Sequence, residues 1–328
     1  MAGLSLSTVT IRCSVYIVEM NIRETGGCVL LGVVMVEHKF GGKHTEIKLE
    51  IIRRYLEAYL RVMKNQKYKN IYVDAFAGTG SRTTTQNGVP LLGELDETSI
   101  VTPGSASLVL EMDTRFDEYL FIDKKSKHVD ALRDLCAKFP NKHTDCKKGD
   151  ANELVKEFCQ STKWEANIPY WGTRAVLFLD PYGMQVEWET LEAIARTKAI
   201  DLWFLFPISA LYRQAARNWS KVDDDKIRAI DRCLGTTEWQ QKFYEPRDQL
   251  GLFDTRSELE RKHDVKSLEK YVKQRLETIF TSWVSSPIEL RNTKGPQLFS
   301  LFFAISNPSV KAKDAAQGIV RHLRKTIG

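Results

Sequence analysis

Aspartate residues that could hold a ligand recur at the ends of short apolar runs in this 328-residue sequence. Asp74 ends "IYVD", Asp123 ends "YLFID", Asp150 stands in "GDAN", and Asp180 ends "VLFLD". An ionised carboxylate can accept several hydrogen bonds, so each residue could hold hydroxyl or amine groups. Ligands of open α/β sheets bind where the strands end. Any one of these acids alone is more often a helix cap or a loop residue, but together, at successive strand ends, they predict a binding site.

A glycine-containing turn, "VDAFAGTG", follows the first of these runs. A dinucleotide fingerprint would need a third glycine where Thr83 stands, and the GxxxxGK[ST] phosphate loop is absent. The third interpretation is an adenosine-sulfonium site like that of class I methyltransferases, whose first motif is an acid followed by a small-residue GxG turn. Asp74, Phe76, Gly78 and Gly80 fit this pattern. A tight turn without a ligand is the remaining alternative.

The other strand-end acids extend this interpretation to a cofactor site for S-adenosyl-L-methionine. Asp123 is expected to accept both ribose hydroxyls, and Asp150 to meet the adenine amino group. With the turn, the predicted cofactor-binding residues are Asp74, Phe76, Gly78, Gly80, Asp123 and Asp150. No histidine or cysteine spacing indicates a metal site.

The segment Asp180-Pro181-Tyr182-Gly183 is the candidate for chemistry. It resembles the (D/N)PP(Y/F) segment of enzymes that methylate amino groups of bases. However, Tyr182 stands at the second proline and Gly183 at the aromatic position. We expect Asp180, Pro181 and Tyr182 to be catalytic, with Asp180 accepting a hydrogen bond from an amine and Tyr182 stacking on the substrate. A structural turn in a protein that binds cofactor without chemistry is the alternative.

Composition is ordinary for a globular protein: 43% hydrophobic, 27% charged, and a net charge of +6. This mild charge permits a nucleic-acid partner without requiring one. The six cysteines are spread without a CxxC pair, which predicts reduced thiols in a cytoplasmic protein. No apolar run reaches the roughly 20 residues of a membrane helix.

Alternating strand and helix patterns position these residues. A helix is expected over residues 46–64 with Thr45 as its N-cap, followed by a strand over 71–75 and a long loop over 81–102. Near-continuous apolar strands then alternate with amphipathic helices, and "SSPIELRN" and "PQLFSLFFAISN" predict an antiparallel pair at the sheet edge. The predicted fold is α/β: a Rossmann-like class I methyltransferase fold with a mostly parallel central sheet and helices on both faces.

The domain organisation is predicted as an N-terminal extension, residues 1–34, and a methyltransferase-like domain, residues 35–328. The extension is poor in charge and lacks a helical period, and Met35 then opens a regular pattern. The extension is therefore interpreted as an upstream-start artefact, with a real N-terminal hairpin as the alternative. A helical insertion is expected at about 209–280.

From about Met35 onward the chain resembles the three-Cys-motif partner proteins, the TcmP family. The residues that carry the resemblance are "FGGKHTEIKLEIIRRYLEAYL", "YVDAFAGTG", "PGSASLVLE", "YLFIDKK", "LFLDPYG" and "LFSLFFAISNP". The resemblance implies a bacterial or archaeal methyltransferase-like protein that works with a three-cysteine-motif protein encoded nearby. That motif itself is absent from this chain.

The leading functional hypothesis is an S-adenosylmethionine-dependent methyltransferase acting on nucleic acid or a nucleotide-derived substrate. Basic and aromatic residues after the fifth strand could meet bases and phosphates, namely Arg213, Arg217, Trp219 and Lys221. A solvated helix with an inward-packed tryptophan would explain them equally well. The second hypothesis is a non-catalytic binding module on the same fold. A metal-dependent hydrolase is disfavoured because no paired carboxylates or histidines stand at ligand spacing.

Overall fold

The computed structural model describes residues 7–13, 16–25, 28–34, 43–85, 99–166, 168–246, 259–291 and 295–327. The chain divides into two compact units, Met1–Phe40 and Gly41–Gly328. The first unit contains the antiparallel strands β1 (Ser7–Cys13), β2 (Tyr16–Thr25) and β3 (Cys28–Val34). Whether residues 1–34 are an extension or an upstream-start artefact stays a prediction.

A central sheet organises the second unit, and its described strands follow the order β13-β15-β10-β9-β4-β7-β8. The strands β4, β7, β8, β9 and β10 are parallel, and β15 runs antiparallel to β10. The short strand β14 also pairs with β15. Their bounds are β4 (Lys69–Asp74), β7 (Glu118–Asp123), β8 (Thr144–Lys148), β9 (Thr173–Leu179), β10 (Ile200–Phe206), β13 (Trp283–Val284), β14 (Ile288–Arg291) and β15 (Gln297–Ile305).

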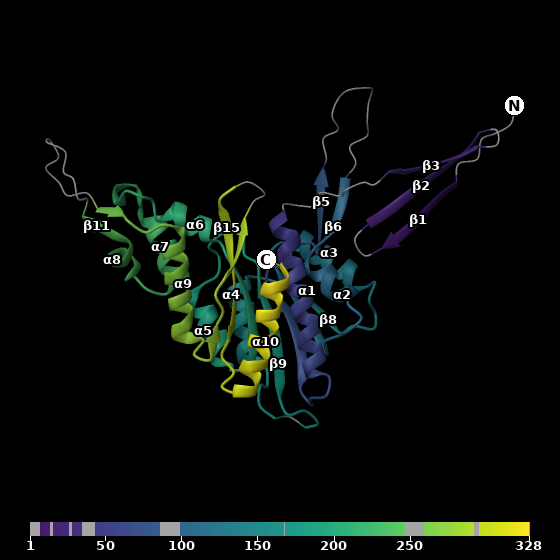
Figure 1. Ribbon diagram of the computed structural model, residues 1–328. Helices are drawn as coiled ribbons and strands as arrows, with labels where there is room; N and C mark the ends of the chain where they lie inside the picture. Colours follow the sequence, from purple (N-terminus) through teal and green to yellow (C-terminus); the bar gives the residue numbers. More distant parts are fainter. Residues whose placement is uncertain are drawn as a thin grey trace, which may run out of the picture. The chain divides into compact units, whose positions relative to one another are not determined.

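Helices cover both faces of this sheet (Figure 1). One face packs against α1 (Lys43–Met63), α2 (Ser105–Glu111), α3 (Ser126–Cys136) and α10 (Val310–Ile327). The other packs against α4 (Ala151–Ser161), α5 (Trp188–Arg196), α6 (Ile208–Gln214), α7 (Asp224–Leu234) and α9 (Val265–Ile279). Successive strand residues alternate between the two cores, since Tyr72 joins the first and Val73 the second. The predicted fold class is confirmed, including the antiparallel strand pair near the C-terminal end.

The predicted local structure differs from the observed one in two places. Thr45 lies inside α1 rather than capping it, because the helix already begins at Lys43. Part of the loop predicted over 81–102 is an antiparallel pair, β5 (Ser81–Thr85) and β6 (Ser99–Pro103). Both strands contain β-branched residues, which favour extended backbone. The prediction of a loop relied on the absence of a regular hydrophobic pattern and gave these residues no weight. Residues 86–98 lie outside the described part.

The segment predicted as a helical insertion follows β10. It contains α6, a 3-10 turn (Trp219–Lys221), α7, α8 (Trp239–Phe243) and α9, with the short antiparallel pair β11 (Tyr244–Pro246) and β12 (Leu259–Arg261) between α8 and α9. No helix among the described residues is long and apolar enough to span a membrane.

Candidate active site

The strand register brings all four predicted acids to one edge of the sheet. Asp150 follows β8, whose last residue, Lys148, pairs with Asp123. Asp74, the last residue of β4, pairs with Phe121 of β7 on one side and Phe178 of β9 on the other. Asp123 ends β7 two residues beyond Phe121, and Asp180 follows directly after β9. The carboxyl ends of parallel strands form the ligand-binding edge of an open α/β sheet, and these acids lie there.

A lysine that sequence reasoning missed completes this group. Lys48 Nζ of α1 lies 2.5 Å from Asp180 Oδ2, and the lysine side chain is only 5% exposed. The ammonium also lies 5.7 Å from the centre of the Phe178 ring. Lys48 stands one turn before Ile52 on the buried face of α1, where the residues Ile51, Ile52, Tyr55 and Leu56 are apolar. A charged residue in an apolar stripe was the available signal, because a buried charge needs a partner.

Asp74 is fully buried beside this ion pair. Its pKa is raised from 3.8 to about 7. Burial is the largest cause and the nearby Asp180 charge adds to it, while hydrogen bonds with Ser105 and Phe76 N and the Lys48 charge oppose the shift. Its Oδ1 accepts a hydrogen bond from Phe76 N at 3.4 Å, whereas its Oδ2 has no hydrogen-bond partner. A buried carboxyl oxygen without a partner is unusual and indicates a place where a ligand could donate a hydrogen bond.

The glycine turn lies against both α3 and the end of β7. Gly78 has φ +61 and Gly80 has φ +72, a region that favours glycine. Gly78 N donates to Asp123 Oδ2 at 3.1 Å. A Cβ on Gly78 would meet nothing within 4 Å, whereas one on Gly80 would lie 2.6 Å from Leu135 Cδ2 of α3. The first glycine therefore faces open space, and the second is packed against the helix.

Asp123 and Asp150 both have partners within the chain. Asp123 Oδ1 accepts from Lys125 N at 2.8 Å and lies 3.1 Å from His128 Nδ1. Asp150 is the N-cap of α4 and accepts from Asn152 N at 2.9 Å. Each carboxylate keeps further acceptor capacity. Their roles toward ribose and adenine stay predictions, and the capping function of Asp150 is an observed alternative for that residue.

The predicted catalytic segment leaves β9 with its side chains in different environments. Pro181 is buried, while Tyr182 is 93% exposed beside the partly buried Asp180. Gly183 turns the chain with φ +73. Asn152 of α4 then fixes the following residues: its Nδ2 donates to Gln185 O, and its Oδ1 accepts from Glu187 N and Thr190 Oγ1, all at 3.0 Å. The segment is thus anchored, and Tyr182 is left free to meet a substrate.

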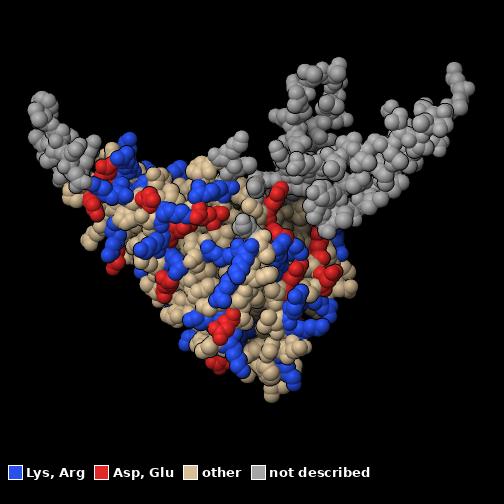
Figure 2. All heavy atoms as spheres, in the orientation of Figure 1, with Lys and Arg blue, Asp and Glu red and all other residues tan. Residues whose placement is uncertain are grey.

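The basic and aromatic residues after β10 do not form an open stacking platform. Trp219 packs edge-on to Tyr244 with ring centres 5.0 Å apart, and it also contacts Trp239. Arg217 forms an ion pair with Glu260. On the face drawn in Figure 2, basic side chains are interspersed with acidic ones. The inward-packed tryptophan that the sequence left open as an alternative is the observed arrangement.

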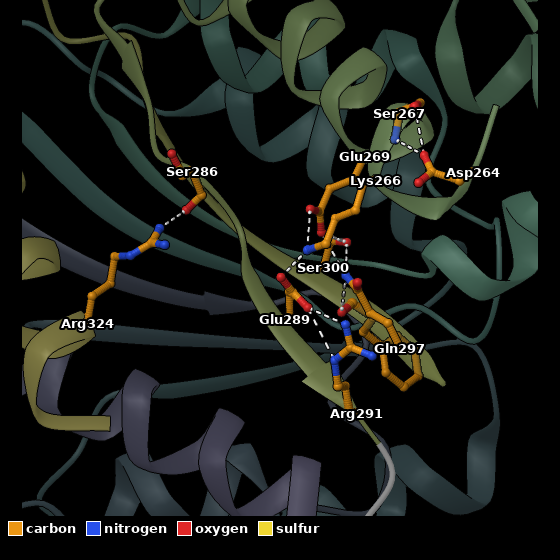
Figure 3. A network of polar contacts seen from close by, with 11 residues as sticks. Asp264, Lys266, Ser267, Glu269, Ser286, Glu289, Arg291, Gln297, Ser300 and Arg324 are labelled. Atoms are coloured by element: carbon orange, nitrogen blue, oxygen red, sulfur yellow. Dashed lines mark hydrogen bonds and ion pairs between the residues drawn. The ribbon is translucent and has the colours of Figure 1, made fainter. Parts of the chain in front are cut away.

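A second buried acid lies near the same edge. Glu269 Oε1 accepts from Gln297 Nε2 at 2.7 Å and from Ser300 Oγ at 2.6 Å, as Figure 3 shows. Ser300 pairs with Phe206, the last residue of β10. Lys266 Nζ lies 3.6 Å from the other oxygen of Glu269. Both Glu269 oxygens thus have partners in the chain, and the cluster holds α9 to β15, while Gln297 Oε1 has no hydrogen-bond partner among the described residues.

The residues present fit the predicted cofactor. Asp74 offers an unpartnered acceptor, Gly78 leaves room beside the turn, and Asp123 stands at the neighbouring strand end. Within the described ranges, no group of three or more histidine, cysteine or acidic side chains could hold a metal ion.

The order of the sheet, with its antiparallel strand beside β10, decides the fold. The chain has a class I methyltransferase-like fold. No protein-family model matches it, and no curated protein matches its sequence. Several solved structures are similar to this chain in fold, at low sequence identity. A Legionella pneumophila protein described by the family model DUF519 is 13% identical with a TM-score of 0.47, over 88% of this chain and 93% of that one.

Two other similar structures hold S-adenosylmethionine or SAH. An O-methyltransferase from Bacillus cereus in complex with SAH is 9% identical, with a TM-score of 0.35 over 82% of this chain and 93% of that one. A fibrillarin from Aeropyrum pernix with natively bound S-adenosyl-L-methionine is 8% identical, with a TM-score of 0.32 over 93% of this chain and 100% of that one. At such scores these likenesses carry no argument about function, which rests on this chain's own side chains.

Proposed function

We propose that this protein is an S-adenosylmethionine-dependent methyltransferase that modifies an amino group of a nucleic acid or a nucleotide-derived substrate. The observation that carries the proposal is the Lys48–Asp180 ion pair at the carboxyl end of β9, immediately beside the buried Asp74. A pair of this kind supplies a fixed, oriented carboxylate at the edge where α/β proteins bind ligands.

The cofactor would be held by the turn and the strand ends. Asp74, Phe76, Gly78, Gly80, Asp123 and Asp150 are the residues proposed to bind it. Asp74 Oδ2 is the acceptor that the chain leaves unused, and the open space at Gly78 admits close approach of a ligand to the backbone. When bound, S-adenosylmethionine supplies an electrophilic methyl group.

The catalytic residues would position the nucleophile. Asp180 accepts a hydrogen bond from the substrate amine, which orients the nitrogen lone pair and receives the proton that the product releases. Lys48 holds the Asp180 carboxylate in place and supplies its counter-charge. Tyr182, exposed next to Asp180, stacks on the planar substrate, and the buried Pro181 fixes the direction of the chain between them.

We also propose, from the sequence resemblance, that the chain belongs to the TcmP family and acts with a three-cysteine-motif protein in a prokaryotic cytoplasm. Co-purification of the two proteins from a host that expresses both, against this protein alone, tests the partnership.

The test of activity separates binding from chemistry. Calorimetric titration with S-adenosylmethionine and S-adenosylhomocysteine should give micromolar binding to the wild-type protein and none to Asp123→Ala. Asp180→Asn removes the carboxylate that pairs with Lys48, so a thermal melt first establishes that the variant is folded. The folded variant should still bind the cofactor but lose methyl transfer to RNA, DNA or nucleotides. The exposed Asp130 of α3 provides the matched control, and Asp130→Ala should change neither quantity.

No cofactor binding by a folded wild-type protein would overturn the methyltransferase proposal. Binding with equal partner-dependent function in wild type and Asp180→Asn would favour the alternative, a non-catalytic module on the methyltransferase fold.

A further inference from the structure

Two cysteines that lie ten positions apart in the sequence are in contact. Cys136 is the last residue of α3, Cys146 lies in the middle of β8, and their sulfur atoms are 3.6 Å apart. Both are free thiols. A disulfide bond has a length near 2.05 Å, so the sulfurs need to approach by about 1.5 Å. We propose that Cys136 and Cys146 are an oxidation site that closes to a reversible disulfide and thereby shifts α3 against the glycine turn.

The pair differs chemically from Cys159 and Cys233. The hydrogen bond with Cys146, and a weaker one with Thr144, lowers the pKa of Cys136, while the same contact raises the pKa of Cys146. Burial raises the pKa of Cys159 and of Cys233 to about 12. The thiolate is the reactive form, so oxidation is directed to the pair. Cys146 is only partly buried, which leaves the pair within reach of a small oxidant.

Hydrogen peroxide is an oxidant that converts the two thiols to a disulfide in two steps. The Cys136 thiolate attacks one peroxide oxygen and the O–O bond breaks, which gives a sulfenic acid and, after protonation, water. The Cys146 sulfur then displaces the sulfenic oxygen, and the S–S bond forms as a second water leaves. Two thiols and one peroxide thus become one disulfide and two waters. A dithiol reductant reverses the reaction by exchange.

The shift would reach the glycine turn through the residue next to Cys136. A Cβ added to Gly80 would lie 2.6 Å from Leu135 Cδ2 and 3.3 Å from Leu132 Cδ2, so these leucines of α3 lie directly beside the glycine. Gly80 also binds α2, since its carbonyl accepts from Gly104 N at 2.9 Å and Ser107 Oγ at 2.8 Å. Close-packed contacts transmit displacements of this size. Any effect on cofactor affinity rests on the proposed function, whereas the disulfide and the shift of the turn do not.

Thiol counting and peptide mapping test the disulfide in the full-length protein. After stepwise peroxide treatment and alkylation in denaturant, the wild-type protein should lose two alkylatable thiols. Trypsin should release residues 134–138 linked to residues 143–147, and dithiothreitol should separate them. Cys146→Ser should not form this link, while Cys159→Ser should form it as wild type does. Sulfinic acid at Cys136, or a disulfide between two chains, would overturn the proposal.

Hydrogen exchange tests the coupling without any cofactor. Amide exchange over residues 77–82 should differ at least about fivefold between the oxidised and reduced wild-type protein, as expected for a coupling free energy of ordinary size. It should be unchanged by peroxide in Cys146→Ser. Circular dichroism melts establish that the variant is folded. A linked peptide with unchanged exchange would refute the shift of the turn, and failure of cofactor binding in both redox states would contradict the proposed function alone.

Discussion

At the scale of single residues, the site depends on charges that are held out of water. Lys48 is buried among apolar side chains and Asp180 is mostly buried, so each carries a desolvation cost that the ion pair helps to offset. Asp74 lies close to both and lacks its own counter-charge. Such perturbed, clustered groups are typical of functional sites, and they make the site sensitive to substitution and pH.

Removal of the Lys48 charge should destabilise the fold and the site together. Lys48→Met keeps much of the volume but removes the ammonium that pairs with Asp180, and we expect a loss of about 3 kcal/mol in the free energy of unfolding. The matched control is Lys69→Met, which breaks the more exposed Lys69–Glu118 ion pair, 2.6 Å long. An exposed pair contributes no more than about 1 kcal/mol. Urea unfolding measures both, and equal losses would contradict the special role of Lys48.

Asp74 should make stability depend on pH in the direction opposite to that of a salt-bridged acid. Its folded-state pKa is near 7 against 3.8 for the ordinary group, so the folded protein binds more protons between these values. Stability therefore falls as pH rises through this window. Asp74→Asn removes the free-energy cost of ionising this buried carboxyl group. At pH 8 the variant should therefore be more stable than wild type by up to about 4 kcal/mol. Cofactor-free urea unfolding should show a clearly larger advantage at pH 8 than at pH 5, because pH 5 lies near the start of the window; equal differences at both would refute it.

At the scale of elements, the glycine turn between β4 and β5 packs against α3 and is hydrogen-bonded to the start of α2 through the Gly80 carbonyl. The two glycines of the turn have similar φ angles but different surroundings: a Cβ added to Gly80 would meet leucine side chains, and one added to Gly78 would meet nothing within 4 Å. This difference separates the folding role of one glycine from the proposed binding role of the other.

Alanine substitution should therefore affect the two glycines differently. Gly78→Ala should cost about 1 kcal/mol of stability, from the left-handed backbone alone. Gly80→Ala should cost at least about 2 kcal/mol because its methyl group also displaces Leu135. Thermal melts give the order of stability. Titration with S-adenosylmethionine should show weaker binding by Gly78→Ala under conditions in which the variant is fully folded. The reverse order of stability would contradict the packing described for Gly80.

At the scale of the whole molecule, the site belongs to one compact unit. All proposed site residues lie within Gly41–Gly328, separate from the unit Met1–Phe40. A chain that begins at Met35 should therefore keep the melting temperature and the cofactor affinity of the full-length protein. A loss of either in the shortened chain would show that residues 1–34 support the domain.

Much of the architecture was predictable because it follows from short-range patterns. Apolar strands alternating with amphipathic helices predicted the layered sheet, and the strand-end positions of Asp74, Asp123 and Asp180 predicted the edge where they meet. Two local predictions were wrong. The helix α1 begins at Lys43, two residues before the predicted cap Thr45, and the β5–β6 pair was missed because its sequence has no clear hydrophobic alternation. Trp219 could not be assigned because burial of one face of a short helical turn is decided by distant elements.

By itself, the sequence determined the fold class, the order of the strands' acids and the glycine turn, since each depends on neighbours along the chain. Only the tertiary structure decided that Lys48 meets Asp180 across 132 positions, that Asp74 is desolvated, and that Cys136 touches Cys146. The physical reason is that burial and charge pairing depend on which elements pack together. That packing follows from the sheet order, and no local pattern in the sequence encodes it.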